Sequence, residues 1–580
     1  MLFKGLNKLK SGSTSHALSH LALFAALVIS NTAAAQSIVP PTADPGRVRN
    51  DIQGSVPSIP APDPQALASP PEVKAPPGAE EVRFVLNKIV ISGASSLSQA
   101  EIAAVYKPLI GKEISLPQLY DIANNITRLY NDKGYILTRA VIPQQEIRNG
   151  AVRIEVIEGY VSSFDIQGEI GPRTQIESYA KELIESGPLT AKTLERYLLL
   201  MNDLPGAMVR SVLSPSKKAD GSAHISLIAE QDRFQGFAGI DNFGNSFLGP
   251  ERLTLGGQFN GLFRSSDQVN GLVLWAPDHD ELKYYSLGFH HNIGNQGTKI
   301  GVSVSQGITN PSLPLSLGGF LEPDGEALFL GFDVDHPFIR SRNLNLYGGL
   351  NFEISRNKTD YIPGFSAIET KDSQRVLRAQ ARISYLDSLQ GYNSGNVVLS
   401  KGFEILGSSE KGDANLSRPE GDPSFTKINL GASRLQHITG PFNVLVAATG
   451  QYSPHNLLSS EEFGFGGTEF GRGYDSSQIT GEYGMAGKIE ISYNDTMQEK
   501  YPNDYQLYTF YDAGKVWNTD AAVGQGGNES AASVGVGTRI GFTSSLRGDA
   551  FIAKPLTEDI TSRGDNSRDL RFKFSLNATF

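Results

Sequence analysis

The sequence predicts two small α+β units followed by an all-β transmembrane barrel of about sixteen antiparallel strands. Three observations predict this fold class. The order of elements expected in residues 84–160 recurs in residues 161–232, which indicates a duplicated unit. The helical pattern ends near residue 233, and the last residues of the chain alternate between apolar and polar side chains.

The composition excludes several classes of protein. The chain has 580 residues, with 51 Lys plus Arg against 61 Asp plus Glu, a formal charge of -10 and no Cys. Without cysteine there can be no cysteine-based zinc finger, thiol catalysis or disulfide. An acidic chain offers no basic surface for a phosphate backbone, so we expect no nucleic-acid partner.

Residues 1–35 are predicted to be a secretory signal peptide. Three lysines precede a short apolar stretch at residues 21–29, and the alanines at residues 33–35 offer a small-residue cleavage site. The apolar stretch is too short to span a bilayer as a helix. We therefore expect an exported protein whose mature chain begins at Gln36.

Residues 36–83 are predicted to be a proline-rich linker. Eleven Pro lie between residues 37 and 77, and such a density favours an extended, semi-rigid tether over a packed core. A short helix at residues 44–53, capped by Asp44, is the alternative for the start of this segment. The spacer is the favoured interpretation of the two.

Residues 84–160 are predicted to form the first unit, with the order β-α-α-β-β. Ser98 and Glu101 have the spacing of a capping box at the start of its first helix. The second helix has an apolar stripe that a small sheet could cover, formed by Leu119, Ile122, Ile126 and Leu129. The strands are expected at residues 84–93, 135–141 and 152–157.

Residues 161–232 are predicted to form the second unit. Its strands are expected at residues 161–168, 206–213 and 222–230, and its helices at residues 174–185 and 190–203. Three glycines of the first unit recur in the second at offsets of 75, 72 and 71 residues, namely Gly93 and Gly168, Gly134 and Gly206, and Gly150 and Gly221. The similar offsets support a duplication.

Residues 233–580 are predicted to form the barrel. The clearest strand is the last one, where every second residue is apolar: Leu570, Phe572, Phe574, Leu576, Ala578 and Phe580. At about 21 residues for each strand and its connection, 348 residues give sixteen strands, enough to enclose an aqueous channel. A pair of soluble β-sandwiches is the alternative fold for this region.

A glycine-rich motif stands out within the predicted barrel. It is GFGGTEFGRGYDSS, residues 464–477, in which five Gly surround Arg472, Gly473 and Tyr474. A loop so rich in glycine can fold tightly and approach a wall closely. If the loop enters the lumen, Arg472 needs a carboxylate partner there.

A second motif offers that partner. It is FYDAGKVW, residues 510–517, with Phe510, Asp512 and Gly514. Asp512 lies among aromatic and small residues, as a charge that points into a lumen would. We expect Arg472 and Asp512 to pair and to fasten the loop inside the barrel. The alternative is a solvated surface loop and a solvated carboxylate.

Together these features resemble the transporter subunit of two-partner secretion, the haemolysin and haemagglutinin secretion-activation proteins of the outer membrane. The Arg472 loop, the FYDAG motif and the aromatic C-terminal strand are similar to that family's barrel. The duplicated unit resembles the family's two POTRA domains, so the resemblance covers residues 84–580. One departure is Phe470-Gly471 before Arg472, where the family commonly has an aliphatic residue.

The resemblance implies a mechanism and a set of partners. An unfolded exoprotein, a haemolysin, adhesin or toxin, would dock through its N-terminal secretion domain on POTRA domains in the periplasm. It would then thread the barrel without a nucleotide. The Arg472 loop would gate the pore and Asp512 would hold it. The barrel would lie in the lipid of the outer membrane of a Gram-negative bacterium, and Phe580 would end the strand read by the barrel-assembly machinery. Some relatives also carry a plug helix, for which residues 44–53 are the candidate here.

Two other transport functions fit parts of the sequence. An insertase of the same superfamily places barrels in the membrane, but such proteins generally carry other numbers of POTRA domains. A general diffusion porin would explain the barrel and leave residues 84–232 without a function. The sequence therefore favours secretion, with the insertase as the alternative.

The sequence lacks the motifs of an enzyme. Seven His lie outside the predicted signal peptide: His224, His279, His290, His291, His336, His437 and His455. They form no HExxH or similar pattern, and there is no GxSxG motif. The adjacent His290 and His291 would point to opposite faces of a strand, as loop or lumen residues and not as metal ligands. We expect no catalytic residue, no cofactor and no metal.

Overall fold

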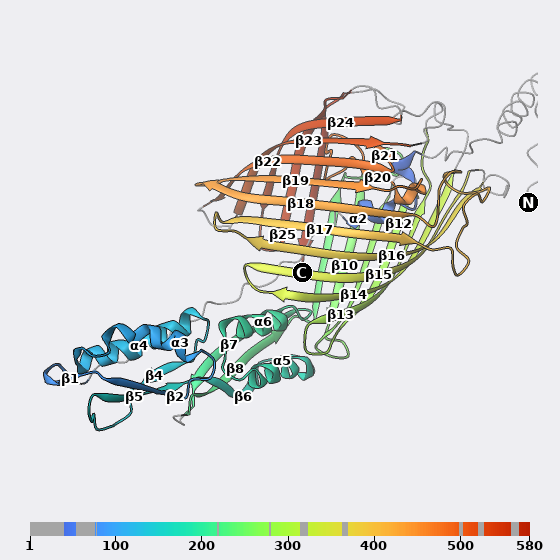
Figure 1. The fold of residues 1–580 in the computed structure, drawn as a ribbon. Helices are drawn as coiled ribbons and strands as arrows, with labels where there is room; N and C mark the ends of the chain where they lie inside the picture. The colour runs from blue at the N-terminus through green and yellow to red at the C-terminus, as the bar shows by residue number, and fades with distance from the viewer. Residues whose placement is uncertain are drawn as a thin grey trace, which may run out of the picture.

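The computed structural model shows a β-barrel with an elongated arm of two α+β units at one end (Figure 1). It describes residues 40–53, 76, 78–216, 220–277, 280–313, 323–361, 369–497, 503–519, 527–557 and 568–580. The predicted signal peptide and residues 36–39, 54–75 and 77 of the predicted linker lie outside the described residues. Within the described ranges, every helix is too short or too polar to cross a membrane.

The first unit is a three-stranded sheet with two helices packed against it. Its elements are η2 (Ala79–Glu81), β1 (Arg83–Val85), β2 (Lys88–Ser92), α3 (Gln99–Tyr106), η3 (Lys107–Leu109), β3 (Glu113–Ser115), α4 (Leu116–Asp132), β4 (Arg139–Val141) and β5 (Ala151–Ile157). The central strand β5 runs parallel to β2 and antiparallel to β4. Because η2 lies before residue 84 and β1 begins at Arg83, the folded part extends into the segment predicted as linker.

The two helices of the first unit form as their sequences predict. Both hydrogen bonds of the capping box between Ser98 and Glu101 are present at the start of α3. Along α4, the predicted stripe faces the core, and Tyr130 is fully buried there, whereas Leu129 is only partly buried. The last large side chain that α4 buries in the core is therefore Tyr130, one position after the predicted Leu129.

The strand predicted at residues 135–141 is shorter in the structure, where β4 covers only its last three residues. After α4 the backbone of Gly134 adopts a φ of 92°, and the Tyr135 N–H donates to the Tyr130 carbonyl. The apolar side chains of Ile136 and Leu137 then pack against the core of the second unit. The apolar pattern of this segment therefore reflects packing between units and not a strand.

Glu158 fastens the end of the first unit to the loop before α3. Its carboxylate accepts hydrogen bonds from the N–H groups of Ser95 and Ser96, at 2.8 Å and 2.7 Å, and from the Tyr130 hydroxyl at 2.9 Å. Partial burial raises the pKa of Glu158, but the hydrogen bonds from the two serines lower it more, so that it lies below its ordinary value.

The low pKa of Glu158 predicts a pH-dependent stability of the first unit. A carboxyl group with a lowered folded-state pKa adds stability above its ordinary pKa, and this stability is lost as the pH falls through the folded-state pKa. We expect the intact protein to lose protease resistance in residues 78–159 on acidification below about pH 4.5. Glu158→Gln should weaken this pH dependence, whereas Glu146→Gln, at an exposed site, should keep it. An unchanged profile in Glu158→Gln would contradict the assignment.

The second unit repeats the first. Its elements are β6 (Tyr160–Gln167), α5 (Thr174–Glu185), α6 (Ala191–Asn202), β7 (Ala207–Pro215) and β8 (Ser222–Gln231). The central strand β8 runs parallel to β6 and antiparallel to β7. The six paired glycines all have positive φ. A Cβ atom would lie 2.3 Å from the Val156 carbonyl at Gly93, and 2.3 Å from the Ala229 carbonyl at Gly168, so the two units share even this close approach.

The two units are joined tightly. The Ala191 N–H donates to the Gly134 carbonyl at 2.8 Å, and the Leu189 N–H donates to the Gly159 carbonyl at 2.9 Å. Gly159 leaves no room for a side chain, because a Cβ atom there would lie 2.5 Å from Cβ of Leu137. Close packing at the joint makes the two units one arm.

Sixteen strands within the described ranges form a closed antiparallel barrel, which confirms the predicted fold class. They are β9 (Phe234–Asp241), β10 (Arg252–Asn260), β11 (Asp267–Ala276), β12 (Leu282–Ile293), β13 (Thr298–Thr309), β14 (Asp324–Arg340), β15 (Leu344–Asp360), β16 (Glu369–Leu386), β17 (Gly391–Gly402), β18 (Thr426–Thr439), β19 (Phe442–Tyr452), β22 (Tyr483–Met497), β23 (Asn503–Trp517), β24 (Asn528–Gly541), β25 (Leu546–Pro555) and β26 (Arg571–Thr579). Chain order is kept around the wall, and β26 closes on β9.

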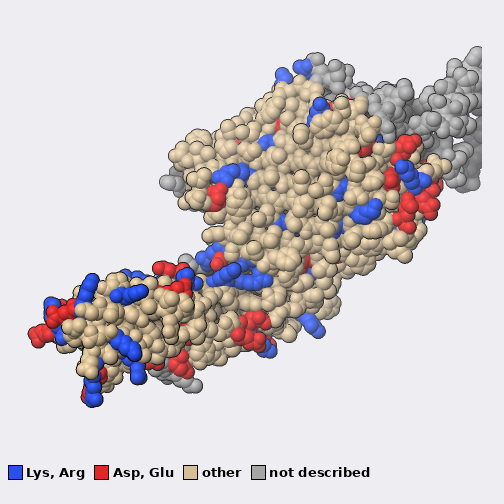
Figure 2. Space-filling model, in the orientation of Figure 1, with Lys and Arg blue, Asp and Glu red and all other residues tan. Residues whose placement is uncertain are grey.

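The outer face of the barrel is apolar. On β13, for example, the side chains of Ile300, Val302 and Val304 are exposed, and the same holds for alternate residues of the other strands. Figure 2 shows few charged side chains on the visible face of the barrel, whereas they are frequent on the arm and at the opposite end of the molecule. An outward apolar band of this kind suits contact with lipid.

The arm meets the barrel through polar contacts. Arg340, at the end of β14, binds both carboxylate oxygens of Asp203 at 2.8 Å. Arg196 of α6 donates to the Pro337 carbonyl at 3.0 Å, and Gln175 of α5 donates to the Gly294 carbonyl at 2.6 Å. In Figure 1, α6 lies next to this end of the barrel wall.

Candidate functional site in the barrel lumen

The glycine-rich loop folds into the barrel. It is flanked by two short paired strands, β20 (Phe463–Phe465) and β21 (Ile479–Gly481). The ring of Phe465 is fully buried against Gly514, where a Cβ atom would lie only 2.2 Å from the ring. The glycine of the FYDAG motif therefore leaves the space into which the base of the loop packs.

Arg472 and Asp512 are in contact at the centre of this site. The Asp512 carboxylate accepts four hydrogen bonds, from the N–H of Gly471 at 3.1 Å and from the N–H, Nε and Nη2 of Arg472 at 2.9, 3.0 and 2.9 Å. Asp512 is fully buried and Arg472 nearly so. One carboxylate therefore binds both the side chain and the backbone of the loop tip, a task that needs its negative charge.

Arg472 also has partners that the sequence did not reveal. Its Nη1 binds the carboxylate of Glu490, on β22, at 2.5 Å, and its guanidinium lies 3.6 Å from the ring centre of Phe510. Glu490 in turn binds Arg539 of β24 at 2.7 Å. The only sequence signal for Glu490 is its polar position between Ile489 and Ile491, whose side chains face outward.

The residues after Arg472 fix the loop tip to β24. The N–H of Gly473 donates to the Ser533 hydroxyl at 3.2 Å, and the Tyr474 hydroxyl donates to the Ala532 carbonyl at 2.8 Å. A Cβ atom at Gly473 would lie 2.7 Å from Cβ of Ser533, so only glycine fits at this position. The predicted motif residues are thus brought together on the wall formed by β22, β23 and β24.

Residues 40–53 also lie inside the barrel, so the favoured prediction of a spacer is wrong for them. They contain η1 (Pro41–Ala43) and a short helix, α2 (Val48–Gln53). Apolar side chains of this segment, including Val48 and Ile52, pack against β11 and β12. Asp44 does not cap α2, which begins four residues later; it accepts hydrogen bonds from the Gly46 N–H and the Ser459 hydroxyl instead.

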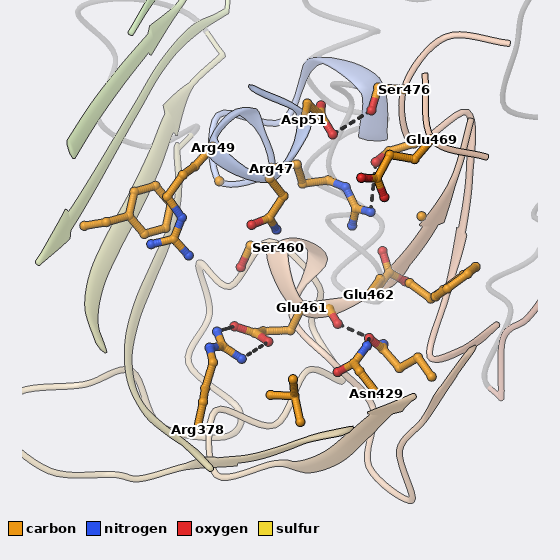
Figure 3. Close-up of a pocket in the computed structure, with 18 of the residues that line it drawn as sticks. Arg47, Arg49, Asp51, Arg378, Asn429, Ser460, Glu461, Glu462, Glu469 and Ser476 are labelled. Atoms are coloured by element: carbon orange, nitrogen blue, oxygen red, sulfur yellow. Dashed lines mark hydrogen bonds and ion pairs between the residues drawn. The ribbon is translucent and has the colours of Figure 1, made fainter. Parts of the chain in front are cut away.

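Charged side chains of this segment hold it to the wall and to the loop. Arg49 binds the Glu353 carboxylate at 2.7 Å, and Arg47 donates to the Ser459 carbonyl at 2.5 Å. Asp51 accepts a hydrogen bond from the Ser476 hydroxyl at 2.6 Å, as Figure 3 shows. The helix and the glycine-rich loop are therefore linked directly within the lumen.

A polar cavity of about 800 Å³ remains between α2, the loop and the wall. Figure 3 shows Arg378 and Glu461 facing one another in it, at 2.6 Å, and Lys427 binds the same carboxylate at 2.7 Å. The lumen is polar, and α2 and the loop obstruct it. Hydrogen bonds and ion pairs hold both obstructions, together with apolar contacts of Val48 and Ile52 in α2 and of Phe465 in the loop.

Phe580 lies away from the lumen, at the arm end of the barrel. Its backbone exchanges hydrogen bonds with Gly236 at 2.7 Å and 2.9 Å, and its ring is exposed beside that of Phe234.

The adjacent histidines both lie on β12: His290 lines the cavity, and His291 contacts the Ser266 hydroxyl. Within the described ranges, no group of three His, Cys, Asp or Glu is placed to bind a metal.

The fold and the lumen define a class of protein, an outer-membrane β-barrel transporter that carries POTRA domains. The profile of the POTRA domain, ShlB-type, matches residues 84–159. The profile of the haemolysin secretion/activation protein ShlB/FhaC/HecB matches residues 224–540, more than half of the chain. The chain belongs to this family of two-partner secretion transporters, which confirms the resemblance drawn from the motifs.

Individual relatives are similar over most of their length. The heme/hemopexin transporter protein HuxB of Haemophilus influenzae is 25% identical over 512 residues, which cover 86% of this chain and 88% of that protein. The outer membrane transporter CdiB of Escherichia coli is 23% identical over 466 residues, covering 77% and 74%. A solved structure of CdiB from Escherichia coli shares the fold, with a TM-score of 0.71, 20% identity and coverage of 88% and 94%.

Proposed function

We propose that this protein exports one exoprotein, a haemolysin, adhesin or toxin, through its barrel in the outer membrane of a Gram-negative bacterium. The observation that carries the proposal is a closed barrel whose polar lumen is obstructed by two segments, which hydrogen bonds and ion pairs link to the wall and to each other. A permanently open porin would not need such segments. In this proposal the two-unit arm lies in the periplasm and receives the unfolded cargo.

The edge of the second sheet offers a docking site for the cargo's N-terminal secretion domain. Strand β7 is an edge strand of nine residues, and the Asn202 side chain binds both the N–H and the carbonyl of Val209 at 2.9 Å. These backbone groups therefore point away from β8. Because a strand repeats every two residues, the backbone N–H and carbonyl groups of Ser211 and Leu213 also point away from β8. An extended cargo segment could pair with these groups by β-augmentation.

Helix α2 is the part of the gate that moves in this proposal, and the glycine-rich loop is the part that stays fixed. The chain between Gln53 and Gly78 has 24 residues, which can reach about 75 Å at the rise of an extended proline-rich chain. Such a tether lets α2 leave the lumen without displacing the first unit. The Arg472 loop stays on the wall, where Asp512 holds it, and shapes the path that α2 vacates.

The outer surface of the barrel would contact two further partners, the membrane lipid and the barrel-assembly machinery. The apolar band of the barrel lies against the lipid of the outer membrane. The exposed aromatic end of the last strand, at Phe580, is the part available to the barrel-assembly machinery during insertion. Export needs no nucleotide and no cofactor, because folding of the cargo outside the cell opposes its return.

Deletion of the gene tests the proposed function. We expect the culture medium and cell surface to lose one large exoprotein, by at least tenfold, while other outer-membrane barrels stay at their normal levels. The wild-type gene should restore it. Loss of many outer-membrane barrels together would instead show an insertase, the alternative function. Quantitative mass spectrometry of the medium and of outer membranes distinguishes the two outcomes.

A further inference from the structure

The barrel closes where β26 meets β9, and this seam has a short ladder. It has five residue pairs, from Ser575 with Asp241 to Thr579 with Phe237, and the backbone bonds between Phe580 and Gly236 extend it by one more. The other ladders of the barrel, within the described ranges, have between eight and seventeen pairs. The seam therefore has fewer paired residues than any other join between barrel strands in the described ranges.

Beyond the pair of Ser575 with Asp241, one more backbone hydrogen bond joins the strands, from the Asn242 N–H to the Phe574 carbonyl at 3.1 Å, and side chains then take over. The Asn242 side chain accepts from the Phe574 N–H at 2.7 Å and donates to the Phe572 carbonyl at 3.0 Å. The Lys573 ammonium donates to the Asn242 carbonyl at 2.8 Å. These contacts continue the join between β26 and the chain after β9 toward the end of the barrel that lies away from the arm.

Asp475 of the glycine-rich loop joins both sides of the seam at that end. One oxygen of its carboxylate binds Arg571, the first residue of β26, at 2.6 Å. The other accepts from the N–H and the hydroxyl of Ser246, in the segment after β9, at 3.2 Å and 3.1 Å. Asp475 is 7% exposed, so these contacts are shielded from water.

The charges around Asp475 require a carboxylate at this place. Arg571 and Lys573 both reach into the lumen from β26, and the nearby Arg252 already binds Asp241 at 2.8 Å. Removing the Asp475 charge would leave Arg571 buried beside a second cation. Asp475 also follows directly after the residues that fix the loop to β24. The loop therefore spans from that wall to the seam.

We propose that Asp475 is a positioning residue that clamps the barrel seam through Arg571 and Ser246. The loop then has two separate attachments. Arg472 binds the loop to the wall, and Asp475 holds β26 against the segment that follows β9. This inference concerns closure of the barrel and goes beyond cargo export. It can be measured on the purified full-length protein without any cargo.

Disulfide cross-linking across the seam tests the clamp, because the chain has no Cys to compete. Gly239 and Asn577 are partners in the seam ladder, and a Cβ atom at Gly239 would lie 2.4 Å from the Asn577 side chain. Their replacement by Cys places two thiols on the same face of the seam. The readout is the rate of cross-linking by a mild oxidant, followed by mass spectrometry of the linked peptides.

Adding Asp475→Asn or Arg571→Gln to this cysteine pair is expected to slow cross-linking at least threefold, whereas Arg571→Lys keeps the rate close to the parent. A control pair, Ser394→Cys with Ser433→Cys on β17 and β18, should be unaffected. An unchanged rate at the seam in Asp475→Asn would overturn the clamp. Equal slowing at both pairs would also overturn it, because it would show a general loss of barrel structure.

Discussion

Asp512→Ala is expected to reduce export of the exoprotein at least tenfold while the barrel still inserts in the membrane. The change removes the acceptor of four hydrogen bonds and leaves Arg472 buried with Glu490 as its remaining carboxylate. Breaking one side of a buried ion pair costs about 3–5 kcal/mol, enough to release the loop tip without unfolding a sixteen-strand wall. The measurements are exoprotein in the medium and heat-dependent electrophoretic mobility of the barrel.

A double-mutant cycle separates coupling from two independent effects. If Arg472 and Asp512 act as one unit, Arg472→Ala, Asp512→Ala and the double variant should lose export to a similar extent. Additive losses in the double variant would contradict coupling. Asp504→Ala is the matched control, because it removes an exposed carboxylate from the same strand, and we expect it to export normally.

Ser211→Pro is expected to block export by closing the docking edge of the second unit. Proline removes the N–H that an added strand would bind, yet an edge strand tolerates it where that N–H points outward. Arg210, the preceding residue, already lies in a strand, as proline requires. We expect at least a tenfold loss of export and of cross-linking between the arm and the cargo's N-terminal domain.

The control for this variant is Ser211→Ala, which removes the hydroxyl and keeps the N–H. It should export as the wild type does. Resistance of the arm to protease would show that Ser211→Pro still folds. A folded Ser211→Pro variant with normal export would refute docking at this edge and direct attention to the first unit.

The architecture could be predicted because it depends on patterns that recur within short stretches of the sequence. Alternation in the last strand and the repeated glycines, such as Gly93 and Gly168, each act within or between adjacent elements. The number of strands followed from chain length and the usual strand length. Local patterns cannot give register, however, and the short seam ladder was not predicted.

The candidate site was predicted only in part for the same reason. Arg472 and Asp512 were identifiable because each stands in an unusual local sequence. Glu490 lies in an ordinary alternating strand, and its contact with Arg472 depends on the pairing of β22 with β23. The position of α2 in the lumen depends on contacts such as Arg49 with Glu353, which no local pattern encodes.

The tight joint between the two α+β units has a mechanical consequence. Because Gly134 and Gly159 are bonded across the joint and Leu137 fills it, the units resist bending against each other. The attachment to the barrel includes the ion pair of Asp203 with Arg340 and the hydrogen bonds of Arg196 and Gln175, which are polar contacts that can exchange with water. A force applied at the distal end of the arm would therefore reach the barrel rim as a torque on the contact between Asp203 and Arg340.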